Sequence, residues 1–420
     1  MQRRGGIIVQ TTVGLYWFIN DLRRLNNSLL DRAINEVDEL VAVYCLPHVT
    51  EYLAAFSGEH NLGTHRERFI HQSVEDLSES LAALGVELNI VEQGTTKAVA
   101  EIIEQRGVSH LYVSEVAGFD ETVMINVIKQ KFPTLEVIQS DNTTLFHSDQ
   151  LPFPLDELPA TFTQFRKQVE PIFELLYPSQ DALYRLGEIA TPTGVVGGER
   201  AAIQHVTWYF SQPFASSYKE TRNHLEGESS STHFSPWLAL GCISPAQIVA
   251  LLRQYEQRNG ANQSTYWIIF ELLWREYFYW YGRKHQQRVF YFSGLTSKQA
   301  LKPFDDEAFQ RWVKGETDFA IVNSCMNQLN ETGFMSNRGR QLVASCLIHE
   351  LGLDWRRGAA YFETQLIDYD VTSNWGNWQY LAGVGADPNP SRRFNLAKQA
   401  ELYDPDSSFT RRWQNTAEKQ

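Results

Sequence analysis

Glu271, Trp274 and Arg275 place a carboxylate, an indole and a guanidinium inside a strongly apolar stretch of sequence. Residues 266–282 are hydrophobic nearly all round, which predicts a buried helix. The spacing i, i+3 and i+4 puts the three side chains on one face of that helix. Burial of either charge without a partner would cost several kcal/mol. The two charges therefore either pair with each other or point at a bound polar ligand.

A second group of polar side chains lies in residues 368–380, where carboxylates and amides alternate with aromatic rings. The side chains concerned are Asp368, Asp370, Asn374, Trp375, Asn377, Trp378 and Tyr380. No helix or strand period accounts for this order, so we expect a structured loop followed by the start of a helix. No matching set of His or Cys accompanies the carboxylates, which argues against a metal site. Polar groups among aromatic rings suit a flat heteroaromatic ligand with hydrogen-bonding edges.

The chain has 420 residues, of which 43% are hydrophobic, so we expect two or three domains with real cores. No apolar run approaches the roughly 18 residues of a membrane-spanning helix. We also expect no secretory signal, because the first apolar stretch lacks a small-residue cleavage site. The four cysteines lie far apart and predict buried thiols in a reducing cytoplasm, not disulfides or a zinc site.

Charge is distributed unevenly along the chain. Residues 1–150 contain 11 basic and 21 acidic side chains, residues 151–420 contain 26 and 29, and the total net charge is −13. Ten of the 11 tryptophans lie beyond residue 200. An acidic protein is a poor candidate for nucleic-acid binding, because attraction to phosphate supplies much of the affinity. A nucleic-acid site would therefore require a local basic patch in the second part of the chain.

The first third of the chain alternates short β-like runs with helical patterns. The strand candidates are residues 7–16, 39–45, 86–91 and 110–113, and the helix candidates are residues 66–84 and 96–106. This order predicts an α/β domain with a Rossmann-like parallel sheet and helices on its faces. No G-x-G-x-x-G or other phosphate-binding loop follows the first strand, so we place no dinucleotide there.

The remainder divides into a connector and a helical region. Residues 151–159 contain three prolines and are typical of a linker, and residues 161–176 carry a helical pattern. Ser-Pro pairs at 235–236 and 244–245 each place a capping hydroxyl before a proline, as at a helix start. We therefore expect three parts: an α/β domain at 1–130, an interdomain connector at 131–200 and an all-α domain at 201–420.

Longer segments of the second part carry a family pattern. They are SYKETRN (217–223), SSTHFSPWLALGCISP (230–245), ELLWREY (271–277), NETGFMSNRGRQ (330–341), DWRRGAAYFETQLIDYDVTSNWGNWQY (354–380) and SRRFNLAKQAELYDPD (391–406). In order and spacing they resemble the photolyase/cryptochrome family, and specifically its DASH-type cryptochromes. Residues 15–30, LYWFINDLRRLNNSLL, resemble the family's opening more weakly. The resemblance implies an antenna-binding α/β domain and a helical, FAD-binding catalytic domain.

The resemblance implies an FAD folded into a U shape inside the helical domain. The residues implied to hold its pyrophosphate are Tyr218, Ser231, Thr232, His233, Phe234 and Ser235. The residues implied to contact the rest of the cofactor are Glu271, Arg275, Asn337, Arg340, Asp368, Asp370 and Asn374. Arg340 would pair with Asp368 against the isoalloxazine, and Asn374 would face its N5 atom. In this arrangement the protein positions and tunes the flavin, which carries the redox chemistry.

The implied reaction is repair of cyclobutane pyrimidine dimers, driven by blue or near-UV light through an electron from excited reduced FAD. This is the activity of a deoxyribodipyrimidine photo-lyase. Glu271 and Asn374 belong to the implied catalytic set, and Trp274 and Tyr380 match the aromatic positions that flank the dimer. Tyr380 stands where class I photolyases usually have Trp, which is typical of DASH-type proteins. We therefore expect a preference for single-stranded DNA, which spares the cost of flipping the dimer out of a duplex.

Other positions of the family pattern would serve DNA binding, electron transfer and light collection. The positions implied to face DNA are Arg222, Arg275, Arg338, Gln341 and Arg392. The positions of the chain implied to carry electrons from the surface to the flavin are Trp312, Trp355 and Trp378. Glu115 matches the acidic residue that contacts a 5,10-methenyltetrahydrofolate antenna, although a solvated surface glutamate is equally compatible with the sequence.

Two other functions stay open at this level. A blue-light signalling cryptochrome with weak or no repair activity would share the fold, but about 14 residues follow the last family segment, too few for a long signalling extension. Binding of single-stranded DNA or RNA without turnover would use the same groove. With any of these functions we expect a cytoplasmic monomer with no membrane partner.

Overall fold

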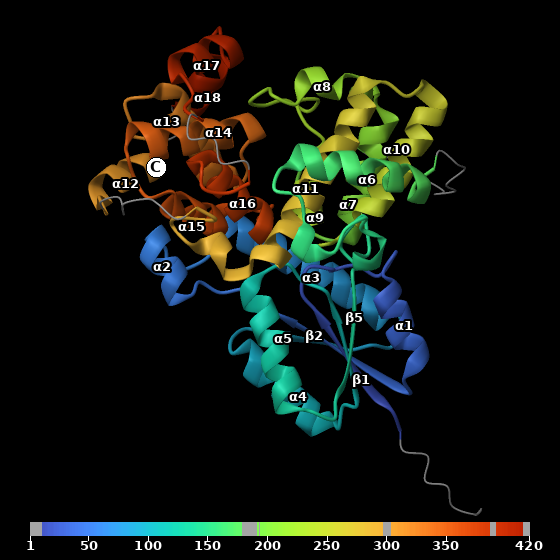
Figure 1. Cartoon of the computed structure of the whole chain (residues 1–420). Helices are drawn as coiled ribbons and strands as arrows, with labels where there is room; N and C mark the ends of the chain where they lie inside the picture. Colours follow the sequence, from blue (N-terminus) through green and yellow to red (C-terminus); the bar gives the residue numbers. More distant parts are fainter. Residues whose placement is uncertain (1–10, 179–190, 193, 297–303, 387–391, 415–420) are drawn as a thin grey trace, which may run out of the picture.

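The computed structural model describes residues 11–178, 191–192, 194–296, 304–386 and 392–414. Its N-terminal region is a parallel sheet with the strand order β3-β2-β1-β4-β5. The strands are β1 (Val13–Phe18), β2 (Glu39–Cys45), β3 (Leu88–Val91), β4 (His110–Ser114) and β5 (Glu136–Ser140). The helices of this region are α1 (Ser28–Glu36), α2 (Glu51–Ser57), α3 (Thr64–Ala82), α4 (Thr95–Arg106) and α5 (Phe119–Lys131). Figure 1 shows helices on both faces of the sheet, as the sequence predicted.

The predicted strands agree with the sheet except for the first and the last strand along the chain, β1 and β5. β2 coincides with the predicted strand at 39–45, and β3 and β4 overlap the strands predicted at 86–91 and 110–113. The strand predicted at 7–16 begins at Val13, while residues 1–10 lie outside the described residues. β5 was not predicted, because its sequence EVIQS is short and half polar, as suits the edge of a sheet. The sheet therefore extends past residue 130 into the predicted connector.

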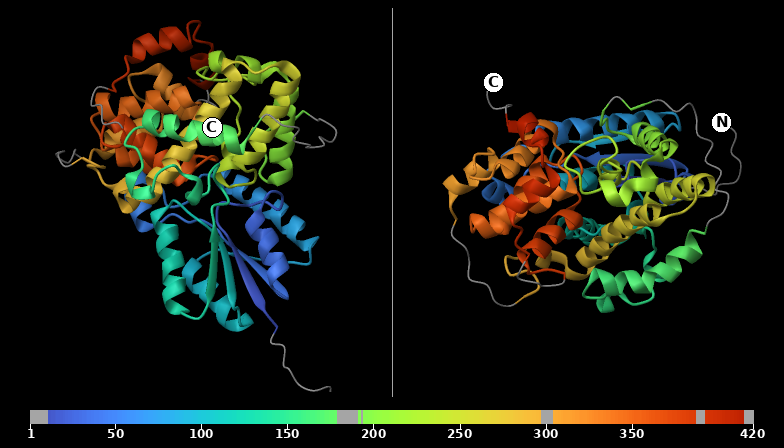
Figure 2. Two further views of the ribbon diagram at one scale, coloured as in Figure 1. Left: turned by 45° about the vertical axis from the view of Figure 1, so that its right-hand side comes forward. Right: turned by 90° about the horizontal axis from the view of Figure 1, so that it is seen from above.

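The second region is helical and covers one end of the sheet (Figure 2). Its first helices are α6 (Phe162–Leu176), α7 (Glu199–Ser211), α8 (Tyr218–Thr221), α9 (Ser235–Ala239), α10 (Pro245–Asn259) and α11 (Gln263–His285). The later helices are α12 (Asp306–Val313), α13 (Ala320–Thr332), α14 (Asn337–Ser345), α15 (Trp355–Gln365), α16 (Val371–Ala382), α17 (Leu396–Tyr403) and α18 (Ser408–Gln414). Short 3₁₀ segments lie at Ser148–Gln150, Leu155–Glu157, Pro213–Ser217 and Gln286–Phe290, and a π-helical segment at Cys346–Glu350. Within the described residues, no helix combines the length and apolar character needed to cross a bilayer.

The buried helix predicted at 266–282 is the central part of α11. Asn262 caps its start, because its side chain accepts hydrogen bonds from the backbone N–H groups of Ser264 and Thr265. Basic side chains fill the last turn, where they oppose the negative end of the helix dipole. Buried residues lie all round this helix, so α11 forms the core against which the other elements pack.

The two Ser-Pro pairs differ in their local structure. Ser244 caps α10 in a capping box with Gln247, as expected. Ser235 instead lies inside the first turn of α9, whose N-cap is Phe234. The Ser235 hydroxyl is used elsewhere, since it donates to Asp368 across 133 residues of sequence. The predicted cap at Ser235 is therefore wrong, because a tertiary hydrogen bond takes the side chain.

Residues 368–380 are more helical than the sequence indicated. α16 begins at Val371 and covers the rest of that segment, and Asp370 caps it by accepting from the Ser373 N–H group at 2.7 Å. The helical period is hidden because α16 is buried on several sides, so polar and aromatic residues alternate without forming one apolar stripe.

A loop after β1 joins the two regions. The buried Arg23 donates to the carbonyl oxygens of Asn142 and, at 3.1 Å, Gly241. Gly241 has a φ of 67°, and a Cβ there would lie 1.9 Å from the carbonyl oxygen of Asn20. Only glycine fits this close approach, which fixes the start of the helical region against the carboxyl edge of the sheet.

Candidate active site

A polar cavity lies among α8, α9, α11, α14 and the start of α16. It has two adjoining lobes of about 240 and 220 Å³. The residues that line both lobes are Ser231, Ser235, Asn337, Arg340, Asp368, Asp370 and Ser373. Together the lobes fall within the range of roughly 300–1,000 Å³ that is common for small-molecule and cofactor sites.

Nearly all residues predicted to contact the cofactor line this cavity. They are Tyr218, Ser231, Thr232, Phe234, Ser235, Glu271, Arg275, Asn337, Arg340, Asp368, Asp370 and Asn374. His233 is the exception, because its side chain does not belong to the lining of either lobe. Its backbone is in the left-handed region at φ 53°, its ring packs 5.2 Å from Phe334, and burial lowers its pKa. Contact of His233 with the cofactor, as part of the segment 231–235, stays a prediction.

The Arg340–Asp368 pair predicted from the family pattern is formed. Nη2 of Arg340 donates to both carboxylate oxygens of Asp368, at 2.9 and 2.7 Å, and Ser235 donates its hydroxyl to the same group at 2.7 Å. Nε of Arg340 is held by the carbonyl oxygen of Met335 at 2.9 Å. The carboxylate is buried and accepts these three hydrogen bonds, so the pair sets the position of the guanidinium in the cavity wall.

Asn374 lies one turn inside α16, in the second lobe. Its Nδ2 donates to the carbonyl oxygen of Ala359 on α15 at 3.0 Å. This bond between neighbouring helices fixes the amide and leaves Oδ1 as the atom that can meet a donor within the cavity. Asp370, which caps the same helix, also lines both lobes.

Glu271 and Arg275 do not pair with each other. Nη1 of Arg222, from the end of α8, donates to Oε1 of Glu271, and its guanidinium lies 4.2 Å above the Trp267 ring. Arg275 donates instead to the carbonyl oxygen of Thr143, at 2.8 Å, in the segment after β5. Burial raises the pKa of Glu271, and the positive charge of Arg222 opposes that rise. Glu271 and Arg275 therefore do not form the ion pair that their spacing on the helix allows, because each of them is bonded to a residue of another segment.

Glu276 is a buried carboxylate that the sequence analysis missed. Its oxygens accept from the backbone N–H groups of Leu145 and Phe146, at 2.9 and 3.2 Å, and from Nε1 of Trp280 at 2.9 Å. Burial raises its pKa to about 7, and these hydrogen bonds oppose the rise. The sequence did contain a signal for this residue, because Glu276 is a second carboxylate within the apolar stretch 266–282. Glu276 serves structure, because it ties the predicted connector to α11.

The two rings predicted to flank a lesion are neighbours. The centroids of Trp274 and Tyr380 lie 6.0 Å apart in an edge-to-face arrangement. The guanidinium of Arg392 lies 3.5 Å above the Tyr380 ring and also donates to its hydroxyl. Phe162, at the start of α6, stacks on Trp274 at 3.8 Å. A helix of the predicted connector therefore packs onto the candidate site.

Of the other residues predicted to face DNA, three line the cavity and Arg338 does not. Arg338 donates to Asn223 at 3.1 Å and lies 4.6 Å from the Tyr403 ring. Burial and the nearby positive charge of Arg222 both lower the pKa of Arg338. Gln341 lines the second lobe. Arg222 and Arg275 face the cavity. Contact of these four side chains, and of Arg392, with DNA stays a prediction.

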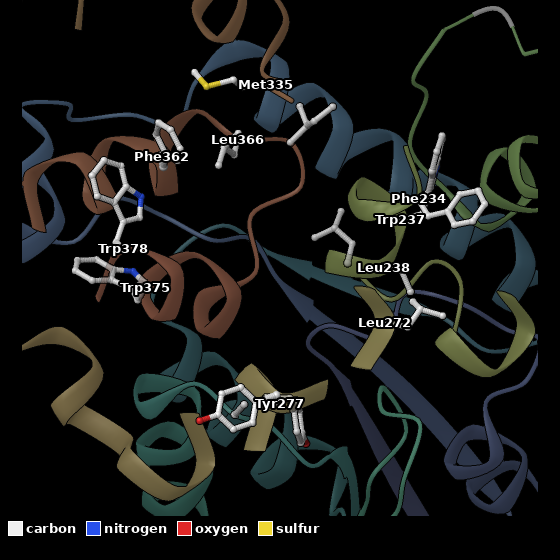
Figure 3. Packing of buried hydrophobic residues seen from close by; sticks show 14 of the residues in the cluster. Phe234, Trp237, Leu238, Leu272, Tyr277, Met335, Phe362, Leu366, Trp375 and Trp378 are labelled. Atoms are coloured by element: carbon white, nitrogen blue, oxygen red, sulfur yellow. The ribbon is translucent and has the colours of Figure 1, made fainter. Parts of the chain in front are cut away.

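The structure brings two of the three tryptophans predicted to carry electrons into direct contact. Trp312, Trp355 and Trp378 are all buried, so none of them forms the surface end. Trp378 lines the second lobe, and Trp312 meets it directly at 6.3 Å. Trp355 contacts Trp375, at 5.9 Å. Figure 3 shows Trp378 beside Phe362, whose ring is 5.2 Å away. The structure therefore places Trp312 next to Trp378, and electron transfer through the three tryptophans stays a prediction.

Glu115 is not a solvated glutamate. Its carboxylate pairs with Arg283 at 3.2 Å, and Arg283 also pairs with Asp141 at 2.9 Å. A separate cavity of about 600 Å³ lies between the carboxyl edge of the sheet and the helical region, and Glu115 does not belong to its lining. Contact of Glu115 with a folate stays a prediction. In the described part of the chain, no three His, Cys, Asp or Glu side chains are grouped as metal ligands.

The matches to known proteins agree with this geometry. The family described as DNA photolyase matches residues 14–183, and the FAD binding domain of DNA photolyase matches residues 267–419. Cryptochrome DASH of Vibrio parahaemolyticus is 53% identical over 416 residues, which cover 96% of this chain and 93% of that protein. The protein of the same name from Idiomarina loihiensis is 48% identical, with coverage of 97% and 94%. A crystal structure of a Synechocystis cryptochrome matches with a TM-score of 0.86 and 36% identity, covering 96% of this chain and 89% of that one.

Most of the cavity lining falls within the matched FAD-binding domain, so the fold and site are those of a photolyase-type flavoprotein. The chain belongs to the photolyase/cryptochrome family, among its DASH-type cryptochromes.

The residues present fit a flavin dinucleotide. Ser231 and Thr232 bring hydroxyls to the first lobe, Asn374 offers an amide oxygen in the second, and Arg340 offers a fixed guanidinium to both. Nε of Arg275 is buried without a hydrogen-bond partner among the described residues. An unpartnered donor in a cavity wall indicates a ligand that supplies an acceptor.

Proposed function

We propose that this protein is a photo-lyase that repairs cyclobutane pyrimidine dimers, preferentially in single-stranded DNA, under blue or near-UV light. One observation carries the proposal. The Arg340–Asp368 pair, Asn374 and Glu271 surround a single cavity within an FAD-binding domain. Their residue types are those that the family pattern implies for a flavin and its substrate, and their convergence on one cavity supports the proposal.

In this proposal the chain holds, orients and shields. When bound and reduced, FAD would supply the light-driven electron that splits the dimer and would receive it back, so the reaction has no net redox change. Arg340 and Asp368 hold the flavin, and the Asn374 Oδ1 atom offers an acceptor to its ring edge. Glu271 offers a carboxyl group to the polar edge of a pyrimidine. The Trp274–Tyr380 pair provides aromatic surface for stacking.

The preference for single strands rests on the entrance to the site. Tyr380 is a smaller ring than the tryptophan usual in class I photolyases, and Arg392 covers one of its faces. Both features reduce the stacking surface available to pull a dimer out of a duplex. A single strand needs little of that assistance, because its bases are already unpaired.

Illumination of the reduced, flavin-loaded protein with an oligonucleotide that carries one dimer tests the proposal. We expect loss of the dimer only in the light, and faster loss from the single strand than from the same strand in a duplex. No light-dependent loss from either substrate would contradict repair. Equal or faster loss from the duplex would remove the strand preference alone.

A blue-light photoreceptor with weak or no repair activity is the second candidate, favoured by one observation. The relatives with the same architecture over nearly their full length are named cryptochromes. Flavin that responds to light in a protein without repair of DNA or RNA strands would support this function instead.

We also propose a methenyltetrahydrofolate antenna at Glu115. In this proposal the Glu115 carboxylate contacts the folate, and its ion pair with Arg283 holds it in position. Copurified folate, lost in Glu115→Gln, would support this proposal, and an unchanged absorption spectrum would contradict it.

The protein is further proposed to act as a cytoplasmic monomer. Its four cysteines are free thiols, which suits a reducing compartment. A molar mass in solution of twice the 48.3 kDa of one chain would contradict the monomer.

A further inference from the structure

The ion pair between Arg222 and Glu271 lies where the cavity meets the outside. Arg222 is the C-cap residue of α8, and its side chain is 21% exposed. The Glu271 side chain, 32% exposed, borders the first lobe. Both groups are therefore within reach of a ligand that enters the cavity mouth.

Arg222 pairs with a carboxylate and lies near a second guanidinium, that of Arg338. Its own charge contributes to lowering the pKa of Arg338, so the two positive charges are close enough to repel each other. Asn223, the next residue along the chain, accepts from Arg338 at 3.1 Å. A phosphate placed against both arginines would relieve their repulsion and would form strong charge-assisted hydrogen bonds. A phosphate diester is thus a direct competitor of Glu271 for Arg222.

Glu271 depends on Arg222 for its positive partner. The charged or titratable groups that face the same lobe are Tyr218, Arg222, Arg275, Arg340, Asp368 and Asp370. Arg275 is engaged with the carbonyl oxygen of Thr143, and Arg340 with Asp368. Among the described residues, Arg222 is the cation in ion-pair contact with Glu271.

We propose that a phosphate of the bound strand replaces Glu271 as the partner of Arg222, and that Glu271 then takes up a proton from water. This inference rests on the proposed function only in that a nucleic-acid strand is the ligand. The exchange balances simply: one ion pair breaks, another forms, and a carboxylate becomes a carboxylic acid. A protonated Glu271 can donate its hydroxyl to a pyrimidine carbonyl oxygen, which the carboxylate cannot do. Arg222 is thereby a positioning residue that couples strand binding to the protonation of Glu271.

The electrostatics of the site support the direction of the exchange. Burial already raises the pKa of Glu271, and Arg222 is the charge that opposes it. Withdrawal of Arg222 removes that opposition, and the negative phosphate raises the pKa further. Strand binding must then be accompanied by proton uptake in the pH range between the two pKa values, by linkage.

Proton uptake by the flavin-loaded protein in the dark tests the proposal. An undamaged oligothymidylate of about eight nucleotides, a length within the usual single-strand site sizes, is added in weak buffer at several pH values. We expect uptake that approaches one proton per bound strand, and an infrared band of a protonated carboxyl group that grows on binding. Glu271→Gln should remove both signals at saturating strand. Arg222→Gln should remove the uptake, because Glu271 is then protonated before the strand arrives, and should show the carboxyl band in the free protein.

Arg32→Gln is the matched control, since it removes an arginine from another Arg–Glu pair, on α1, remote from the cavity. This variant should leave the proton uptake and the infrared band of the carboxyl group unchanged. Strand binding without proton uptake at any pH between about 5 and 8 would overturn the proposal, as would uptake that persists in Glu271→Gln. Uptake without repair of a dimer would reject the proposed function and keep this inference, and repair without uptake would do the reverse. A strand that does not bind would overturn both.

Discussion

The sheet region and the helical region bury different kinds of side chain. One face of the sheet packs an aliphatic core around Leu15, Val41 and Val113, and most carboxylates of this region are exposed to solvent. The helical region buries many aromatic rings and several charges, including Asp368, Glu276 and Arg357. Buried charges cost stability unless they are paired. The sheet region also buries Asp21, Arg23 and Asp76, so what distinguishes the helical region is that its buried Asp368 lines the candidate site. Net charge per region does not show this, because it counts solvated and buried groups alike.

The largest effect should come from the aromatic core. Trp378→Phe removes the indole that lines the flavin cavity and should nearly abolish photoreduction of the flavin, while repair by protein reduced beforehand continues. Trp312→Phe should slow photoreduction more than Trp355→Phe, because Trp312 contacts Trp378 directly. Flash absorption spectroscopy measures both. Trp17→Phe, in the core of the sheet region, is the control and should have no effect on photoreduction.

Loss of the buried ion pair should have the next largest effect. Asp368→Asn leaves Arg340 without its carboxylate, and breaking a buried pair costs about 3–5 kcal/mol. We expect flavin to be lost on gel filtration and the unfolding transition to move to a lower denaturant concentration. Asp31→Asn, in the exposed pair with Arg24, should change the free energy of unfolding by less than about 1 kcal/mol. Equal effects of the two substitutions would contradict the comparison between the regions.

From the raised pKa of Glu276 we expect the free energy of unfolding to depend on pH. Its folded-state pKa of about 7 lies above the usual 4.5, so the folded protein binds a proton that the unfolded chain has released. The stability contributed by this proton is present below pH 4.5 and is lost as the pH rises to about 7, by an amount on the order of 3 kcal/mol. Denaturant unfolding at a series of pH values should show this fall. Glu276→Gln should flatten it, and an unchanged slope would refute the assignment.

The smallest effect should be on the salt dependence of strand binding. Each phosphate contact on a single strand contributes about −0.7 to the slope of log K against log salt. Arg392→Gln should therefore reduce the slope by about 0.7, if Arg392 meets a phosphate as predicted. Arg106→Gln, in an exposed pair with Glu39 in the sheet region, should leave the slope unchanged. Fluorescence anisotropy at several salt concentrations distinguishes the two. An equal slope for all three proteins would exclude a phosphate contact by Arg392.

Local pattern predicted much of the fold. The strands at 39–45 and 110–113 were found because short apolar runs alternate there with helical patterns, and the helix at 266–282 because its apolar stretch is too long for a strand. β5 was missed because an edge strand needs no continuous apolar run. α16 was read largely as a loop because its rings and amides face several neighbours.

Residue types alone determined which side chains could do chemistry, because a carboxylate or guanidinium in an apolar stretch requires a partner wherever the chain folds. The family pattern then indicated a flavin cavity and an ion pair between Arg340 and Asp368, and that ion pair is formed. Only the tertiary structure decided which partner each charge received. Glu271 met Arg222 and Arg275 met Thr143, across 49 and 132 residues of sequence. Such pairs depend on the packing of α8, α11 and the segment after β5, and no spacing along one helix contains that information.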